Sequence, residues 1–178
     1  MNSFVQANAK SYFYCICQCR SCVNINEEME PVEKKRATES AHASSLLFAG
    51  GTFARQVERL AMEMWKPSGL SPSQAQLLLH ILDNDFAFPV YICQEFQVGP
   101  STITRLAEKL EKKGLAGRYD MENGGTFIMA TEEGRKLKPV LEDCERAFGE
   151  RCNALLGEQA AFSLACRLNK ASDKLAGY

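Results

Sequence analysis

The chain has 178 residues, of which 46% are hydrophobic and 24% are charged, enough for one globular domain with a sizeable core. Its 21 lysines and arginines nearly balance 22 aspartates and glutamates, which gives a formal net charge of −1. This balance excludes a protein that binds nucleic acid through bulk basicity alone. No run approaches about 18 apolar residues, so we expect no membrane-spanning helix and a cytoplasmic protein.

The first 38 residues differ in composition from the rest and are expected to form a poorly ordered extension. They hold four of the eight cysteines, at Cys15, Cys17, Cys19 and Cys22. We interpret these as reduced thiols, which translation from Met29 would remove. Two alternatives stay open: four thiolates can hold a metal or an iron–sulfur cluster, and clustered thiols can act as a redox switch.

Two helices are expected before the centre of the chain. An apolar stripe at helical spacing predicts the first, which ends at Trp65 before Lys66-Pro67-Ser68-Gly69. The stripe consists of Phe53, Val57, Leu60, Ala61 and Met64. Ser71-Pro72-Ser73-Gln74 combines a capping box with a proline at the first helical position, so it begins the second helix. The buried face of that helix is expected to be Leu77, Leu78, Ile81 and Leu82.

Residues 89–97 predict a short helix. Val98-Gly99 predicts a tight turn after it, before a second stretch with helical apolar spacing. That pattern begins at Pro100 and predicts a helix with one apolar stripe, formed by Ile103, Leu106, Ala107 and Leu110. Gly114 is placed to end the helix in a left-handed conformation. A short helix, a brief turn and a further helix are the arrangement of the helix-turn-helix, a DNA-binding motif.

The polar side of this helix carries the candidate DNA-binding residues. Hydroxyls near a helix N-terminus can approach base edges, arginine can bind guanine through two hydrogen bonds, and lysine can neutralise phosphate. The candidates are Pro100, Ser101, Thr102, Thr104, Arg105, Lys109, Lys112 and Arg118. We expect the hydroxyls and Arg105 to contact base edges and phosphate, and the other cations to hold the DNA backbone. An ordinary solvated helix face is the open alternative.

After Gly114 the apolar period changes from that of a helix to that of a strand. Residues 115–120 and 126–130 predict two strands, and Asn123-Gly124-Gly125 supplies the residues that a tight hairpin turn needs. A hairpin in this place predicts the wing of a winged helix. From residue 119 to residue 126 the segment holds two acids and no base.

Two long helices are expected after the hairpin. Thr131 can cap a helix that runs to about Leu156, with Pro139 bending it and Gly157 ending it, and residues 158–175 predict a last helix. The first and the last two helices carry more apolar residues than one copy of the chain can cover. Those that need cover are Leu46, Leu47, Phe148, Leu155, Leu156, Phe162 and Cys166.

This order of motifs resembles the MarR family of bacterial transcription regulators. The resemblance rests on Ser101-Thr102-x-Thr104-Arg105-Leu106, on Leu110-Glu111-Lys112-Lys113-Gly114-Leu115 with Arg118, and on Thr131-Glu132-Glu133-Gly134-Arg135 after the hairpin. It covers roughly residues 40–176. It implies a mainly α fold: a winged helix-turn-helix at residues 70–131, flanked by dimerisation helices at 39–66 and 131–176, in a domain spanning 39–178.

The resemblance also implies a function. A homodimer would present two recognition helices to a pseudo-palindromic site in double-stranded DNA. It would act as a repressor that is released by a small aromatic ligand, bound between the dimerisation helices and the winged helix. The candidate lining residues of that pocket are Phe53, Trp65, His80 and Tyr91.

The wing departs from the family's pattern, in which an Asp-x-Arg or Asp-Arg-Arg element carries an arginine into the minor groove. Here the tip cannot make that contact, which keeps open a winged-helix protein-interaction module with weak or no DNA binding. The second alternative is a thiol- or metal-responsive sensor that uses the N-terminal cysteines.

An enzyme is not expected. The chain has two histidines, His42 and His80, and neither lies in a recognisable catalytic or metal-binding motif. It has no glycine-rich phosphate loop. We therefore expect no catalytic residues, no metal and no cofactor.

Overall fold

The computed structural model describes residues 45–122 and 124–176. The four N-terminal cysteines and the domain boundary expected at residue 38 lie outside the described residues. The chain divides into two compact units, one up to Val57 and one from Glu58 onward. Helix α3 (Leu46–Met64) begins in the first unit and ends in the second.

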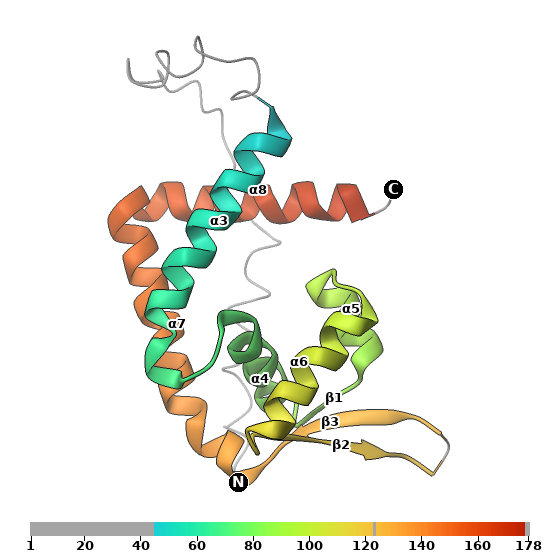
Figure 1. Cartoon of the computed structure of the whole chain (residues 1–178). Helices are drawn as coiled ribbons and strands as arrows, with labels where there is room; N and C mark the ends of the chain where they lie inside the picture. Colours follow the sequence, from blue (N-terminus) through green and yellow to red (C-terminus); the bar gives the residue numbers. More distant parts are fainter. Residues whose placement is uncertain (1–44, 123, 177–178) are drawn as a thin grey trace, which may run out of the picture. The chain divides into compact units, whose positions relative to one another are not determined.

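The second unit contains a winged helix followed by two long helices (Figure 1). Its elements are η2 (Lys66–Ser68), α4 (Pro72–Asp83), β1 (Phe86–Ala87), α5 (Pro89–Phe96), α6 (Pro100–Lys112), β2 (Ala116–Asp120), β3 (Thr126–Ala130), α7 (Glu132–Leu156) and α8 (Glu158–Ala176). The expected fold class, mainly α with a winged helix-turn-helix, is confirmed. No helix among the described residues is long and apolar enough to cross a membrane.

Local signals in the sequence explain where the helices begin and end. The Ser71 hydroxyl accepts from the Gln74 N–H at 3.4 Å, and the Gln74 side chain accepts from the Ser71 N–H at 3.1 Å, so the expected capping box is present. At the end of α6, the N–H groups of Gly114 and Leu115 donate to the carbonyls of Glu111 and Leu110. This is a Schellman motif, with Gly114 in the expected left-handed conformation at φ 72°.

The sheet is antiparallel, with strand order β1-β3-β2. The hairpin of β2 and β3 was expected, but strand β1, which pairs Phe86 with Met129, was not. The first hairpin strand begins at Ala116 rather than at residue 115, because the Leu115 N–H caps α6 by donating to the Leu110 carbonyl. The Leu115 carbonyl still accepts from the Thr131 N–H at 3.0 Å, in register with the hairpin.

The core lies between the helices of the winged helix, one face of the sheet and the start of α7. Its largest fully buried side chains are Leu77, Leu78, Ile81, Ile92, Ile103, Leu110, Ile128 and Leu141. Each contributes roughly 1.5–3 kcal/mol of hydrophobic stabilisation. This core fixes the direction in which the remaining side of α6 points.

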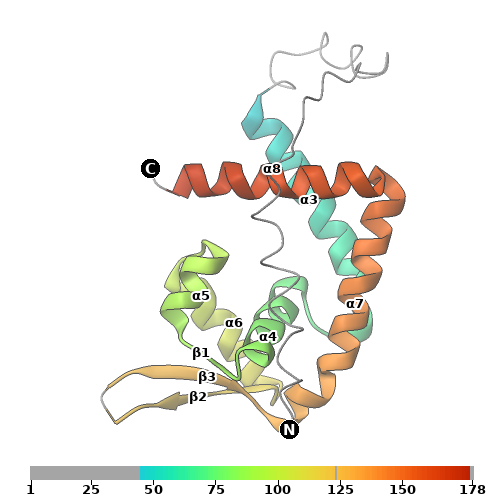
Figure 2. The same cartoon turned by 180° about the vertical axis from the view of Figure 1, so that it is seen from behind.

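Helix α7 leads from the wing to α8, as Figure 2 shows from behind. It begins at the expected cap, where the Thr131 hydroxyl accepts from the Gly134 N–H at 3.1 Å and donates to the Gly114 carbonyl at 2.6 Å. A Cβ at Gly134 would collide with the Leu115 carbonyl oxygen. Pro139 lies inside α7 without ending it, and the helix runs to Leu156 as expected.

Candidate nucleic-acid interface

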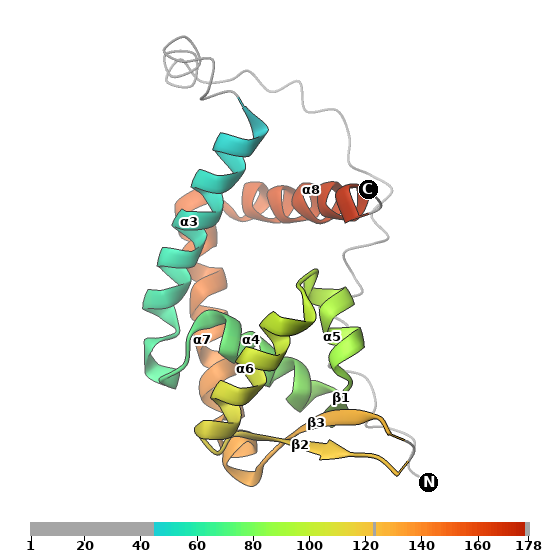
Figure 3. The same cartoon turned by 45° about the vertical axis from the view of Figure 1, so that its right-hand side comes forward.

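Helix α6 has one buried side and one exposed side. Ile103, Ala107 and Leu110 are buried, and Leu106 is half-buried. The exposed side chains are Pro100, Ser101, Thr102, Thr104, Arg105, Lys109 and Lys112. Packing of the apolar stripe therefore turns every candidate DNA-binding residue of this helix toward solvent (Figure 3 shows α6 beside α4 and α5).

The turn between α5 and α6 contains a left-handed residue that is not glycine. Gln97 has φ 51°, and the Val98 N–H donates to the Cys93 carbonyl at 3.1 Å. Helix α5 consequently ends at Phe96, one residue earlier than expected. Cys93 and Phe96 are half-buried against the core beside this turn.

Thr104 in α6 and Lys113 just after it are already engaged in hydrogen bonds. The Thr104 hydroxyl donates to the Pro100 carbonyl at 3.0 Å, so toward DNA it can act as an acceptor. Lys113, just beyond the helix, donates to the Gly69 carbonyl at 2.9 Å and ties the end of α6 to the loop before α4. Over the part of the chain that the structure describes, Arg105, Lys109 and Lys112 form no ion pair.

Arg118, in contrast, is paired. Its Nε and Nη2 donate to the two carboxylate oxygens of Glu111, each at 2.8 Å, and its backbone N–H donates to Glu111 Oε1 at 3.0 Å. These hydrogen bonds and the charge of Glu111 raise the pKa of Arg118 above its ordinary value. The cation at the root of the wing is therefore largely compensated by an acid from α6.

The wing tip is acidic and exposed. Asp120 and Glu122 are both exposed, and Asp120 Oδ1 accepts from the Thr126 hydroxyl at 2.9 Å. Gly124, at φ 86°, makes the turn, and its N–H donates to the Met121 carbonyl at 3.0 Å.

The four residues expected to line a ligand pocket have different surroundings. Trp65 is a core residue, only 3% exposed, whereas Tyr91 is 64% exposed. His80 Nδ1 lies 3.4 Å from Glu95 Oε1, and its ring contacts Phe96 edge to face. Phe53 is half-buried and belongs to the first unit.

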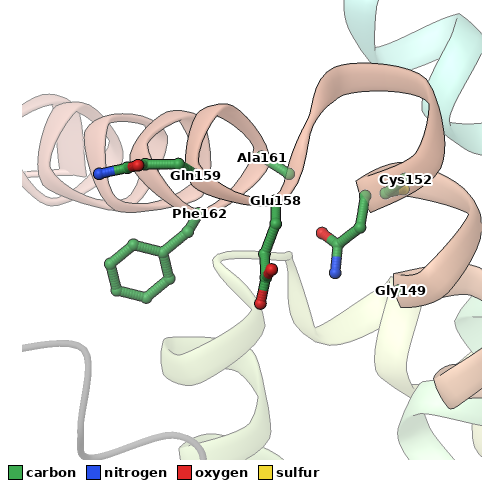
Figure 4. Close-up of a pocket in the computed structure, with 7 residues that line it drawn as sticks. Gly149, Cys152, Glu158, Gln159, Ala161 and Phe162 are labelled. Atoms are coloured by element: carbon green, nitrogen blue, oxygen red, sulfur yellow. The ribbon is translucent and has the colours of Figure 1, made fainter.

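Two surface hollows of the second unit have linings that do not include Trp65, His80 or Tyr91. One, of about 570 Å³, is lined by Arg59, Met62, Glu63, Lys66, Gly69, Leu70 and Ser71. The other, of about 590 Å³, lies where α7 meets α8 (Figure 4) and is lined by Gly149, Cys152, Asn153, Glu158, Gln159, Ala161 and Phe162. Burial raises the pKa of the Cys152 thiol, which makes it less reactive than an ordinary cysteine.

Residues 68–120, which include α4, α5, α6 and β2 of this winged helix, match the model of the MarR family. This winged helix belongs to the MarR family. The family resemblance inferred from the residues is therefore confirmed. A search of curated proteins gives no match.

Several solved structures share the MarR fold of this chain. A MarR-family regulator from Listeria monocytogenes, complexed with 26mer DNA, is 20% identical with a TM-score of 0.63, over 75% of this chain and 91% of its own. CouR from Rhodococcus jostii, bound to p-coumaroyl-CoA, is 20% identical with a TM-score of 0.62, over 77% and 95%. The transcriptional repressor CouR bound to a 23-mer DNA duplex is 19% identical with a TM-score of 0.66, over 82% and 99%. At these identities the likeness is one of fold.

Proposed function

We propose that this MarR-family chain is a homodimeric regulator that reads a pseudo-palindromic DNA site with α6. The observation that carries the proposal is the row of exposed hydroxyls and exposed cations along this helix. Ser101 and Thr102 lie in its first turn, at the positive end of the helix dipole, which favours a phosphate or a base-edge acceptor. Arg105 follows one turn later, within reach of a guanine if that turn enters the major groove.

Lys109 and Lys112 extend the cationic row toward the end of α6. Both are exposed, and lysine acts as a flexible point charge rather than a planar fork. We assign them to the DNA backbone, where they add affinity without adding sequence preference. Arg118 can contact the DNA backbone only when its hydrogen bonds to the Glu111 carboxylate are broken.

The dimer is proposed from apolar side chains that the single chain leaves exposed at its helical ends. They are Leu46, Leu47, Phe48, Leu155, Leu156, Phe162, Leu168 and Leu175. Two residues expected in this set are covered within one copy: Phe148 is half-buried against the core and Cys166 is buried. A two-fold dimer would place two recognition helices about 34–36 Å apart, one helical turn of DNA.

We further propose that the chain represses transcription and that a small aromatic ligand releases it. The CouR structures support both parts of this proposal. One is of a transcriptional repressor bound to DNA, and another has p-coumaroyl-CoA bound. Phe53, Trp65, His80 and Tyr91 remain the proposed ligand contacts, within a proposed domain spanning 39–178. Tyr91 needs cover from a partner or a ligand to serve in this role, because the single chain leaves it exposed.

The experiment that tests the proposal is selection of DNA by the purified protein from sheared DNA of its source organism at near-physiological salt. We expect enrichment of one pseudo-palindrome. A folded dimer that enriches no sequence would contradict the proposal.

A second candidate function is a winged-helix interaction module that binds DNA weakly or not at all. The acidic tip and the compensated Arg118 favour it. Glu122→Arg distinguishes the two functions better than a change at Gly124, whose φ of 86° strains any L side chain. A DNA-reading winged helix should gain affinity and a salt slope steeper by about 1. An interaction module should gain neither.

A further inference from the structure

The sheet of the winged helix carries aromatic side chains on the face turned away from the core. Residues directly opposite each other on paired strands share a face, and Tyr119 lies opposite Phe127 while Phe86 lies opposite Met129. Their neighbours Ala116, Ile128 and Ala130 are buried on the other face. Tyr119 remains 48% exposed and Phe86 50% exposed, so this outer face is open to solvent.

Five rings form one connected surface here, called the aromatic wing face: Phe86, Phe88, Tyr91, Tyr119 and Phe127. Tyr119 stacks on Phe127 with ring centroids 5.6 Å apart, and Phe127 meets Phe86 edge to face at 6.1 Å. Phe88 contacts Phe86 at 5.7 Å and Tyr91 at 5.9 Å. Because the rings hold one another in place, a partner would lose little free energy in ordering them.

The absence of a side chain at Gly117 leaves room for the Tyr119 ring on this face. A Cβ at Gly117 would lie 3.0 Å from the Tyr119 hydroxyl oxygen and 3.2 Å from its ring. The hydroxyl end of the Tyr119 ring therefore lies over a position without a side chain, and the residue is 48% exposed. An aromatic ring presented in this way attracts cations.

The charges around the aromatic wing face are acidic. Asp85 precedes Phe86, Glu122 follows Tyr119 by three residues, and both carboxylates are exposed. From residue 67 to 104 and from residue 119 to 134, the sequence contains no lysine or arginine. Arg118 and Asp120 alternate to the opposite face of β2, and Arg118 is paired there with Glu111.

We propose that the aromatic wing face binds a basic segment of another protein, whose arginine or lysine side chains lie over the rings and pair with the surrounding carboxylates. Aromatic rings and carboxylates together favour a cation with apolar neighbours. DNA is disfavoured, because its phosphates would meet Asp85 and Glu122. A symmetric contact with the same face of a second copy is disfavoured too, because it would bring these acids together.

This inference goes beyond DNA recognition by α6 and does not depend on it. The test uses the full chain and three synthetic peptides of about eight residues, the length of an ordinary strand. In each peptide valine alternates with arginine, glutamine or glutamate. Affinity is measured by calorimetry, and the site by changes in the amide NMR signals of the protein.

We expect the arginine peptide to bind at least about tenfold more tightly than the other two, and to shift the signals of Phe86, Tyr119 and Phe127. Tyr119→Ser should weaken binding about tenfold. The double variant Asp85→Asn, Glu122→Gln keeps every ring, and should weaken binding severalfold and flatten its salt dependence. The matched control Asp143→Asn, Glu150→Gln removes two exposed carboxylates from α7 and should bind as the unchanged chain does.

The proposal is overturned if the arginine and glutamate peptides bind alike, or if the shifted signals lie elsewhere. It is also overturned if Tyr119→Ser abolishes an association between dimers, which would assign the face to a second copy. A loss of DNA affinity in Tyr119→Ser would instead assign the face to DNA. The DNA selection experiment stays independent of all three results.

Discussion

At the level of single residues, the pairing of Arg118 with Glu111 sets how much positive charge the winged helix offers to DNA. Three hydrogen bonds of 2.8–3.0 Å join the two residues. A phosphate that binds Arg118 must therefore displace a carboxylate from it. Arg118 was expected from the sequence as a free backbone contact, but its partner lies seven residues away across a helix end, and helical spacing alone does not show such a contact.

Glu111→Gln should therefore strengthen DNA binding. Glutamine keeps an acceptor for the Arg118 N–H but removes the charge that holds the guanidinium. We expect a severalfold gain in affinity for all sequences and a salt slope steeper by about 1. Titrations at several salt concentrations measure both. Glu150→Gln, which removes the same charge from α7, is the control, and equal behaviour of the two variants would refute the role of Glu111.

At the level of elements, signals between neighbouring residues were sufficient to predict most helix and strand boundaries from the sequence. Contacts between different elements could not be predicted in this way. The capping box at Ser71 and the glycine after α6 involve neighbouring residues, so the sequence shows them directly. Strand β1 has two residues and no periodicity of its own, and only its pairing with β3 makes it a strand. The aromatic wing face was missed for a related reason, since the sequence predicts that Tyr119 and Phe127 lie in strands but not that their rings meet.

The Thr-x-x-Gly sequence at the start of α7 acts through such a contact between elements. Gly134→Ala would push a methyl group into the Leu115 carbonyl and disturb the three bonds around Thr131, so we expect a loss of about 2 kcal/mol or more in the free energy of unfolding. Gly149→Ala in the same helix meets nothing within 4 Å and should gain about 0.5–1 kcal/mol. Urea unfolding compares them, and similar values for both would contradict this account.

At the level of the whole molecule, an acidic group where α4 meets α7 makes stability depend on pH. Partial burial, and then the charges of Asp83 and Glu142, raise the pKa of Glu145 above its ordinary value. The Lys138 ammonium group pairs with the Asp83 carboxylate, at 2.7 Å, and not with that of Glu145. Because the folded pKa is raised, stability is fully present below the unfolded pKa of Glu145 and is lost as pH rises through its folded pKa.

Glu145→Gln should therefore be more stable than the unchanged chain at neutral pH, by a few tenths of a kcal/mol for a group near the surface. The difference should vanish below about pH 4, where an ordinary glutamate is protonated. Thermal unfolding across this pH range tests it. A difference that stays constant with pH would show that packing, not charge, is responsible.

The central claim is that α6 reads DNA, and the most direct test compares Arg105→Ala with Lys112→Ala on the selected site and on unrelated DNA at fixed salt. Arg105→Ala should cost about 1–3 kcal/mol on the selected site and lower the ratio of specific to non-specific affinity. Lys112→Ala should weaken both and leave that ratio unchanged. An unchanged ratio in Arg105→Ala would contradict the account, because the exposed side of α6 would then contribute charge without reading sequence.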